Sequence, residues 1–93
     1  MILKNIKLDV SNFDGRWDSQ YYLDWIMSLE RYFKWYEMSQ ERRIRFTAMK
    51  LVGQAGNYWS NVERLMAIKR QEPVQMWEEM RAKLNQKYLP ITF

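Results

Sequence analysis

The chain has 93 residues, enough for one domain, and contains neither cysteine nor histidine. It therefore cannot build a disulfide, a zinc site of the usual kind or a Ser-His-Asp triad, and we expect no enzyme, metal or cofactor. The net charge is +4, with −1 in residues 1–37 and +5 in residues 38–93. The basic excess in the second half has two possible interpretations: it keeps the protein soluble, or it makes a weak non-specific contact with RNA. No apolar run reaches the roughly 18 residues of a membrane span.

The N-terminal part predicts a short extended segment, because Ile6, Leu8 and Val10 alternate with polar residues. A lone strand is not stable, so we expect it to lie across helices or to pair with a partner strand. A turn at Asp14-Gly15 follows. Within a single domain of residues 1–93, we assign residues 1–17 to this segment and turn, and residues 18–90 to a helical core.

Helix signals recur four times along the remaining chain. The first helix is predicted near residues 19–36, after an N-cap at Asp18 or Ser19, and the second near residues 40–52, after an N-cap at Ser39 and before a stop at Gly53. The third is predicted near residues 54–70 and the fourth near residues 75–88. These signals predict an all-α fold, a compact bundle of four to five short helices with an extended N-terminal segment.

Apolar residues at helical spacing predict the core of this bundle. The residues assigned to it are Leu29, Phe33, Leu51, Trp59, Val62, Trp77 and Leu84.

Candidate interface residues lie near the helix ends. Trp17 and Trp35 are candidates because tryptophan is enriched among the residues that dominate interface energetics. Arg42, Arg43 and Arg45 cluster near the start of the second helix. They are either solvated side chains, or a contact to nucleic acid or to an acidic neighbouring subunit.

Six short motifs in this order resemble the capsid domain of the Gag protein of gypsy-class retrotransposons, above all plant elements. The first two are Phe13-Asp14-Gly15 with Asp18, and Tyr22-Leu23-Asp24-Trp25 with Leu29-Glu30. The others are Met49-Lys50-Leu51-Val52-Gly53-Gln54-Ala55, Tyr58-Trp59, Met76-Trp77-Glu78-Glu79-Met80 and Tyr88-Leu89-Pro90. The resemblance covers roughly residues 6 to 90, and a related lobe occurs in the domesticated Gag protein Arc.

The resemblance implies an N-terminal capsid lobe that assembles with its own copies into hexamers and pentamers of an intracellular, cytoplasmic virus-like particle. It also implies a second helical lobe, which we expect beyond this chain. An alternative is a peptide-binding or RNA-associated module of a domesticated Gag. In the Arc relative such a lobe binds peptides, and here Tyr22, Trp25 and Tyr32 are the candidate groove residues, with residues 6–10 as the extended part.

Overall fold

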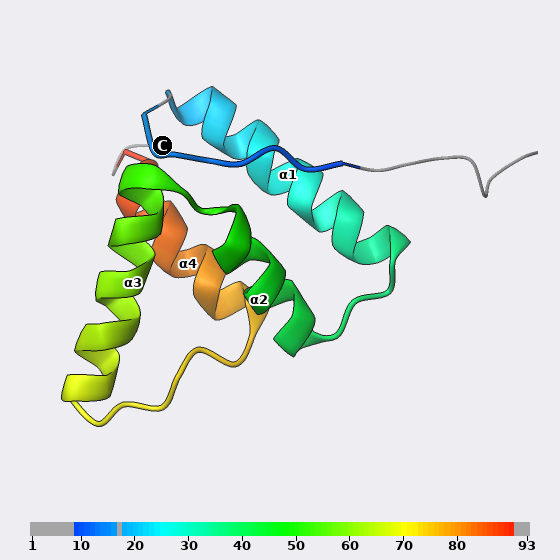
Figure 1. Ribbon diagram of the computed structural model, residues 1–93. Helices are drawn as coiled ribbons and strands as arrows, with labels where there is room; N and C mark the ends of the chain where they lie inside the picture. The colour runs from blue at the N-terminus through cyan, green and yellow to red at the C-terminus, as the bar shows by residue number, and fades with distance from the viewer. Residues whose placement is uncertain (1–8, 17, 91–93) are drawn as a thin grey trace, which may run out of the picture.

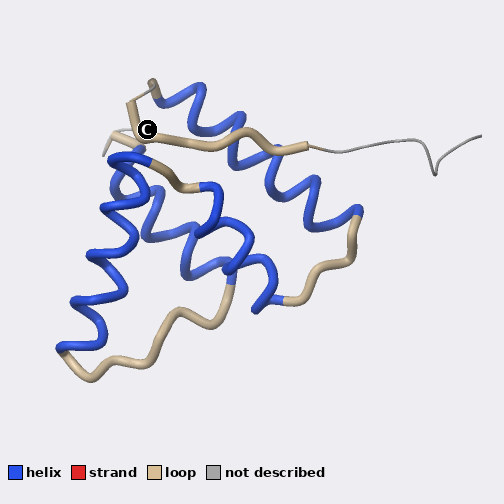
Figure 2. Tube along the Cα trace, viewed as in Figure 1, coloured by secondary structure: helices blue, strands red, loops and turns tan. Residues whose placement is uncertain are grey.

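The computed structural model describes residues 9–16 and 18–90, and four helices make up most of this part (Figure 1). They are α1 (Ser19–Trp35), α2 (Gln40–Lys50), α3 (Gly53–Ile68) and α4 (Trp77–Tyr88). Apart from one isolated bridge, the described residues form no β-structure (Figure 2). The all-α prediction is confirmed, and each predicted helix corresponds to one observed helix.

The first two helices begin at the N-caps that the sequence indicates. The Asp18 carboxylate accepts a hydrogen bond from the Tyr21 amide at 2.9 Å, and the Ser39 hydroxyl accepts one from the Arg42 amide at 3.3 Å. Each bond satisfies an amide that the first turn of a helix leaves without an intrahelical partner. Both helices therefore start where local sequence alone predicts.

The boundary between α2 and α3 differs from the prediction. The second helix was expected to reach residue 52 and to stop at Gly53, but α2 ends at Lys50. Leu51 is extended and forms a parallel bridge with Phe13. The Phe13 amide donates to the Lys50 carbonyl at 2.8 Å, and the Val52 amide donates to the Phe13 carbonyl at 3.0 Å. The N-terminal segment thus uses backbone groups that a longer helix would need.

The N-terminal segment lies across the helices, as one of the two predicted arrangements has it (Figure 1). Phe13 is fully buried, and its ring centroid lies 4.9 Å from that of Trp25 and 5.0 Å from that of Tyr88. The Trp25 indole N–H donates to the Ser11 carbonyl at 2.7 Å. Residues 6–8 of the predicted extended segment lie outside the described residues.

The core lies between α1, the N-terminal segment and the other three helices. α2 packs on both α3 and α4. Six of the seven predicted core residues are buried: Leu29, Phe33, Leu51, Trp59, Trp77 and Leu84. The seventh, Val62, is only half-buried and packs against the edge of the core. Val62 thus lies at the edge of the predicted core, although Met66, further along α3, is buried.

Candidate functional site

The C-terminal end of α3 exposes apolar side chains. Residues 65–68 form the run Leu-Met-Ala-Ile, and only Met66 of the four is buried. Leu65 is 48% exposed and Ile68 is 65% exposed. We call Leu65, Ala67 and Ile68 the α3 tip. Exposed apolar side chains that lie close together often mark a contact site, so the α3 tip is a candidate contact surface.

The position of the α3 tip suits a contact with another molecule. In Figure 1 the end of α3 lies at the far side of the molecule from α1. The segment that follows returns toward α4 and meets the inner side of α3, where Met66 and Ala67 border a hollow with Pro73 and Val74. The inner side is therefore partly covered by the chain itself, and Leu65 and Ile68 remain exposed.

A second surface lies where the C-terminal half of α1 meets α2. Three aromatic side chains lie in a row there, and we call them the ring column: Tyr36, then Tyr32, then Phe46. The Tyr36 and Tyr32 centroids are 4.6 Å apart with planes tilted by 45°, and those of Tyr32 and Phe46 are 4.5 Å apart with planes within 10° of parallel. The Lys50 ammonium lies 5.5 Å from the Phe46 centroid. The stacked and tilted ring contacts and the cation–π contact hold these side chains relative to one another.

Basic side chains border the ring column. Arg42 and Arg45 are exposed on α2, and together with Phe46, Met38 and Met49 they line a hollow of about 420 Å³. Arg45 forms an ion pair with Glu41 at 3.2 Å, and both side chains are 76% exposed. An ion pair so open to water contributes little, so Arg45 remains available to another anion.

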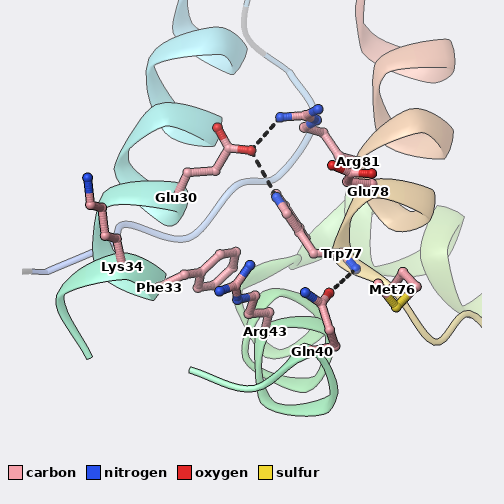
Figure 3. A pocket seen from close by; sticks show the side chains of 9 residues that line it. All are labelled: Glu30, Phe33, Lys34, Gln40, Arg43, Met76, Trp77, Glu78 and Arg81. Atoms are coloured by element: carbon pink, nitrogen blue, oxygen red, sulfur yellow. Dashed lines mark hydrogen bonds and ion pairs between the residues drawn. The ribbon is translucent and has the colours of Figure 1, made fainter. Parts of the chain in front are cut away.

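A third candidate is the hollow of about 450 Å³ between α1, α2 and α4 that Figure 3 shows. The Glu30 carboxylate points toward α4 and accepts hydrogen bonds from the Trp77 indole N–H at 2.9 Å and from Arg81. The Gln40 side-chain oxygen accepts the Trp77 amide at 2.7 Å, which caps α4 from the start of α2. Because of this long-range cap, α4 begins at Trp77, two residues later than predicted.

The polar groups of this hollow are largely paired within the chain. The Arg43 guanidinium lies over the Phe33 ring at 5.6 Å, and its Nε donates to the Met38 carbonyl at 2.9 Å. Glu30 is held by its two donors, and Lys34 points away in Figure 3. These contacts fasten α1 and α2 to α4, and we call the hollow and its lining residues the joint. Among those residues, no nucleophile lies next to a general base.

Those predicted interface residues that the structure describes lie at the α1–α2 end of the molecule. Trp35 is 44% exposed, Arg42 and Arg45 are exposed, and Arg43 is half-buried against Phe33. Trp17 lies outside the described residues. Arg43 thus belongs to the joint, whereas Trp35, Arg42 and Arg45 remain candidates for an interface.

Of the three predicted groove residues, only Trp25 borders a hollow, one of about 450 Å³ between α1 and the N-terminal segment. Tyr22 is fully buried, and its hydroxyl donates to Asn85 Oδ1 at 2.6 Å. Trp25 is buried too, because the N-terminal segment covers it. Tyr32 is half-buried in the ring column. Tyr22 and Trp25 are therefore core residues, and peptide binding at this place stays a hypothesis.

Sequence reasoning missed the α3 tip and the ring column. The four-residue apolar run at 65–68 was visible, but the helical stripe of α3 explained only one of its members. Tyr36 and Phe46 fall on or beside apolar helical stripes in the sequence, but contacts between rings on two helices depend on tertiary packing and could not be predicted.

Two kinds of feature are absent from the described residues. No group of three or more acidic side chains there could hold a metal ion. No helix among them is long and apolar enough to cross a membrane.

A comparison with known families gives one match. Residues 7–89 match the model described as "Retrotransposon-derived protein PEG10, N-terminal capsid-like domain". No curated protein and no solved structure shows significant similarity to the chain. The match covers most of the chain and agrees with the motif order, and the gypsy-class and plant affinities remain predictions.

Proposed function

The chain belongs to the family of retrotransposon-derived N-terminal capsid-like domains, and from this membership we propose that it assembles with copies of itself into the shell of a particle. The family match is the observation that carries the proposal. A capsid-like domain has a structural role, and the four-helix fold agrees with it. Hexamers and pentamers inside the cell are the assemblies that the resemblance implies.

The α3 tip supports this proposal with a specific surface. Shells grow from heterologous contacts, in which one patch of a copy meets a different patch of the next. Leu65 and Ile68 provide an apolar patch that the described part of the chain leaves exposed. A contact centred on two aliphatic side chains buries much less than the roughly 1,200 Å² of a stable interface, so each contact is weak. Many weak contacts hold a lattice together once it forms.

We also propose that the domain is not an enzyme. Without cysteine and histidine, acid–base work would depend on carboxylates, lysines or tyrosines. The carboxylate best placed between helices, that of Glu30, is already engaged by Trp77 and Arg81. A structural role therefore accounts for the joint without any reaction.

Sedimentation velocity over a rising concentration series tests the proposed self-association. We expect the average sedimentation coefficient to increase with concentration, because weak contacts are populated only near their dissociation constant. The double variant Leu65→Gln with Ile68→Gln should flatten that increase. Met27→Gln serves as the control, because Met27 is an exposed apolar residue on α1 that lies outside the α3 tip.

Two results would contradict the proposal. A coefficient that stays constant up to the solubility limit would show that the chain does not self-associate. An equal effect of the α3-tip variant and the Met27→Gln control would show that the tip is not a specific contact. Circular dichroism of each variant verifies that the helices are retained.

A further inference from the structure

The net charge of the chain is concentrated in one stretch. Residues 31–50, from the C-terminal half of α1 through α2, hold six basic and two acidic side chains and so carry +4. The rest of the chain has nine of each sign and is neutral. A basic excess of this kind suits a polyanion where its side chains share a surface, as Arg42 and Arg45 do at the hollow beside Phe46.

The ring column lies within the same stretch. Tyr32 and Tyr36 come from α1 and its C-cap, and Phe46 comes from α2. At the Phe46 end, the Lys50 ammonium lies over the Phe46 ring. At the Tyr36 end of the column Tyr36 is 46% exposed, and its one ring contact among the described residues is the tilted contact with Tyr32. The Tyr36 end of the column is therefore open to one more planar group.

The charges beside the column are available to a ligand. Arg42 has no carboxylate partner among the described residues, and Arg45 has only the exposed contact with Glu41. Both line the hollow next to Phe46. Phosphates following this hollow would lie close to two guanidinium groups, which suit phosphate oxygens in geometry and charge.

We propose that this surface binds single-stranded RNA, with a base stacked on Tyr36 and the backbone phosphates on Arg42 and Arg45. Proteins that bind single strands without sequence preference combine a basic track with aromatic rings on which bases stack, and the α1–α2 end of this domain has both. The proposal goes beyond assembly of the shell and does not depend on it, because the α3 tip takes no part in the RNA site.

A second copy of the chain is a less suitable occupant than RNA. A second copy could offer residues 9–30, which hold five acidic side chains and one basic side chain and so carry −4. Of these acids, Asp14 and Glu30 already pair with arginines of their own chain and Asp18 caps α1, whereas RNA carries a phosphate on every nucleotide.

Fluorescence anisotropy with a labelled single-stranded RNA of about 20 nucleotides, longer than a typical site, tests the proposal over a salt series. We expect Arg42→Gln with Arg45→Gln to weaken binding at low salt and to reduce the slope of log affinity against log salt by about 1 to 1.5, because each phosphate neutralised on a single strand contributes about 0.7 to that slope. The matched control is Arg64→Gln with Lys69→Gln, which removes the same charge from exposed positions on and just after α3. It should change the slope much less.

Tyr36 variants separate stacking from charge. Tyr36→Ala should weaken binding about fivefold or more and leave the salt slope unchanged, since it removes a ring and no charge. Tyr36→Phe keeps the ring and should retain nearly all of the affinity. Thermal melts of each variant verify folding, and Tyr36 is exposed enough that its truncation should leave the fold intact.

Three outcomes would overturn the proposal. Equal slopes for the α2 pair and the control pair would mean that only total charge matters. Unchanged affinity in Tyr36→Ala would mean that no base stacks there. If the α2 pair altered sedimentation in the absence of RNA and left anisotropy unchanged, the surface would be a contact with another copy. Failure of the α3-tip test leaves this experiment unaffected.

Discussion

Replacing Trp59 with alanine should destabilise the fold more than any exposed substitution of the same kind. Trp59 is 2% exposed and packs in the central core from α3. Truncation of a buried tryptophan typically costs about 3–5 kcal/mol. Its indole Nε1 is buried without a hydrogen-bond partner in the part of the chain that the structure describes. Alanine removes that unsatisfied group, which offsets about 1 kcal/mol or more of the loss.

We therefore expect a cost near the lower end of this range, about 3 kcal/mol. A domain of this length has a total stability of about 5–14 kcal/mol, so most molecules should still fold at room temperature. For domains of 60–100 residues the melting temperature falls by about 4–8 °C per kcal/mol, which predicts a decrease of about 12–24 °C. Thermal unfolding followed by far-ultraviolet circular dichroism measures the decrease.

Trp35→Ala is the matched control, because Trp35 is 44% exposed on α1. Its cost should stay within about 0.5 kcal/mol, as for most surface substitutions. Trp59→Phe should cost less than Trp59→Ala, since it keeps an aromatic ring and also removes the unpaired N–H. If the two alanine variants melted at the same temperature, Trp59 would not be a core residue and the assignment of the inner face of α3 would be wrong.

Three further predictions concern the interior and the joint. Gly56→Ala should destabilise by about 1–3 kcal/mol in urea titrations, because its Cβ would lie 2.8 Å from the Leu51 carbonyl oxygen; a stabilised variant would contradict this close approach. A double-mutant cycle between Glu30 and Arg81 should give a coupling below about 1 kcal/mol, since their side chains are 36% and 38% exposed, and a coupling several times larger would contradict it. Burial raises the pKa of three tyrosine hydroxyls, those of Tyr22, Tyr58 and Tyr88. The folded state holds these protons more tightly than the unfolded chain, whose tyrosines ionise near pH 10.0. The three tyrosines should therefore stabilise the fold fully below that pH and progressively less above it, which thermal melts can measure. A melting temperature that does not change at higher pH would refute this.

Local signals determine most of the fold. The N-caps at Asp18 and Ser39 and the apolar stripe of α1 depend on residues within a few positions of one another, so the starts of α1 and α2 could be predicted. The apolar spacing also placed Trp59 and Trp77 in the core.

The errors occur where distant parts of the chain meet. α2 is shorter than predicted because Phe13 takes its last backbone groups, and α4 starts later because Gln40 caps it. Neither partner is near in sequence, so no local pattern could indicate the pairing. Helical spacing placed Val62 on the inner face of α3, but it does not show how completely other elements cover a residue at the edge of the core.

The candidate sites were predicted less well than the fold. The exposure of an aromatic side chain cannot be read from spacing alone, and Tyr22 and Trp25, which were predicted to line a groove, are buried. Arg42 and Arg45 were recognised as candidates from charge, but the ring column beside them depends on the packing of α1 against α2.

Electron microscopy of the chain at high surface density tests the capsid role most directly. Display through a terminal histidine tag on a nickel–lipid monolayer raises the local concentration, so that weak contacts act together. We predict a continuous two-dimensional lattice of rotationally symmetric rings, absent for Leu65→Gln with Ile68→Gln and retained for Met27→Gln. A full monolayer of separate copies, or of closed two-fold dimers that do not extend, would contradict the assembly of this domain into a shell.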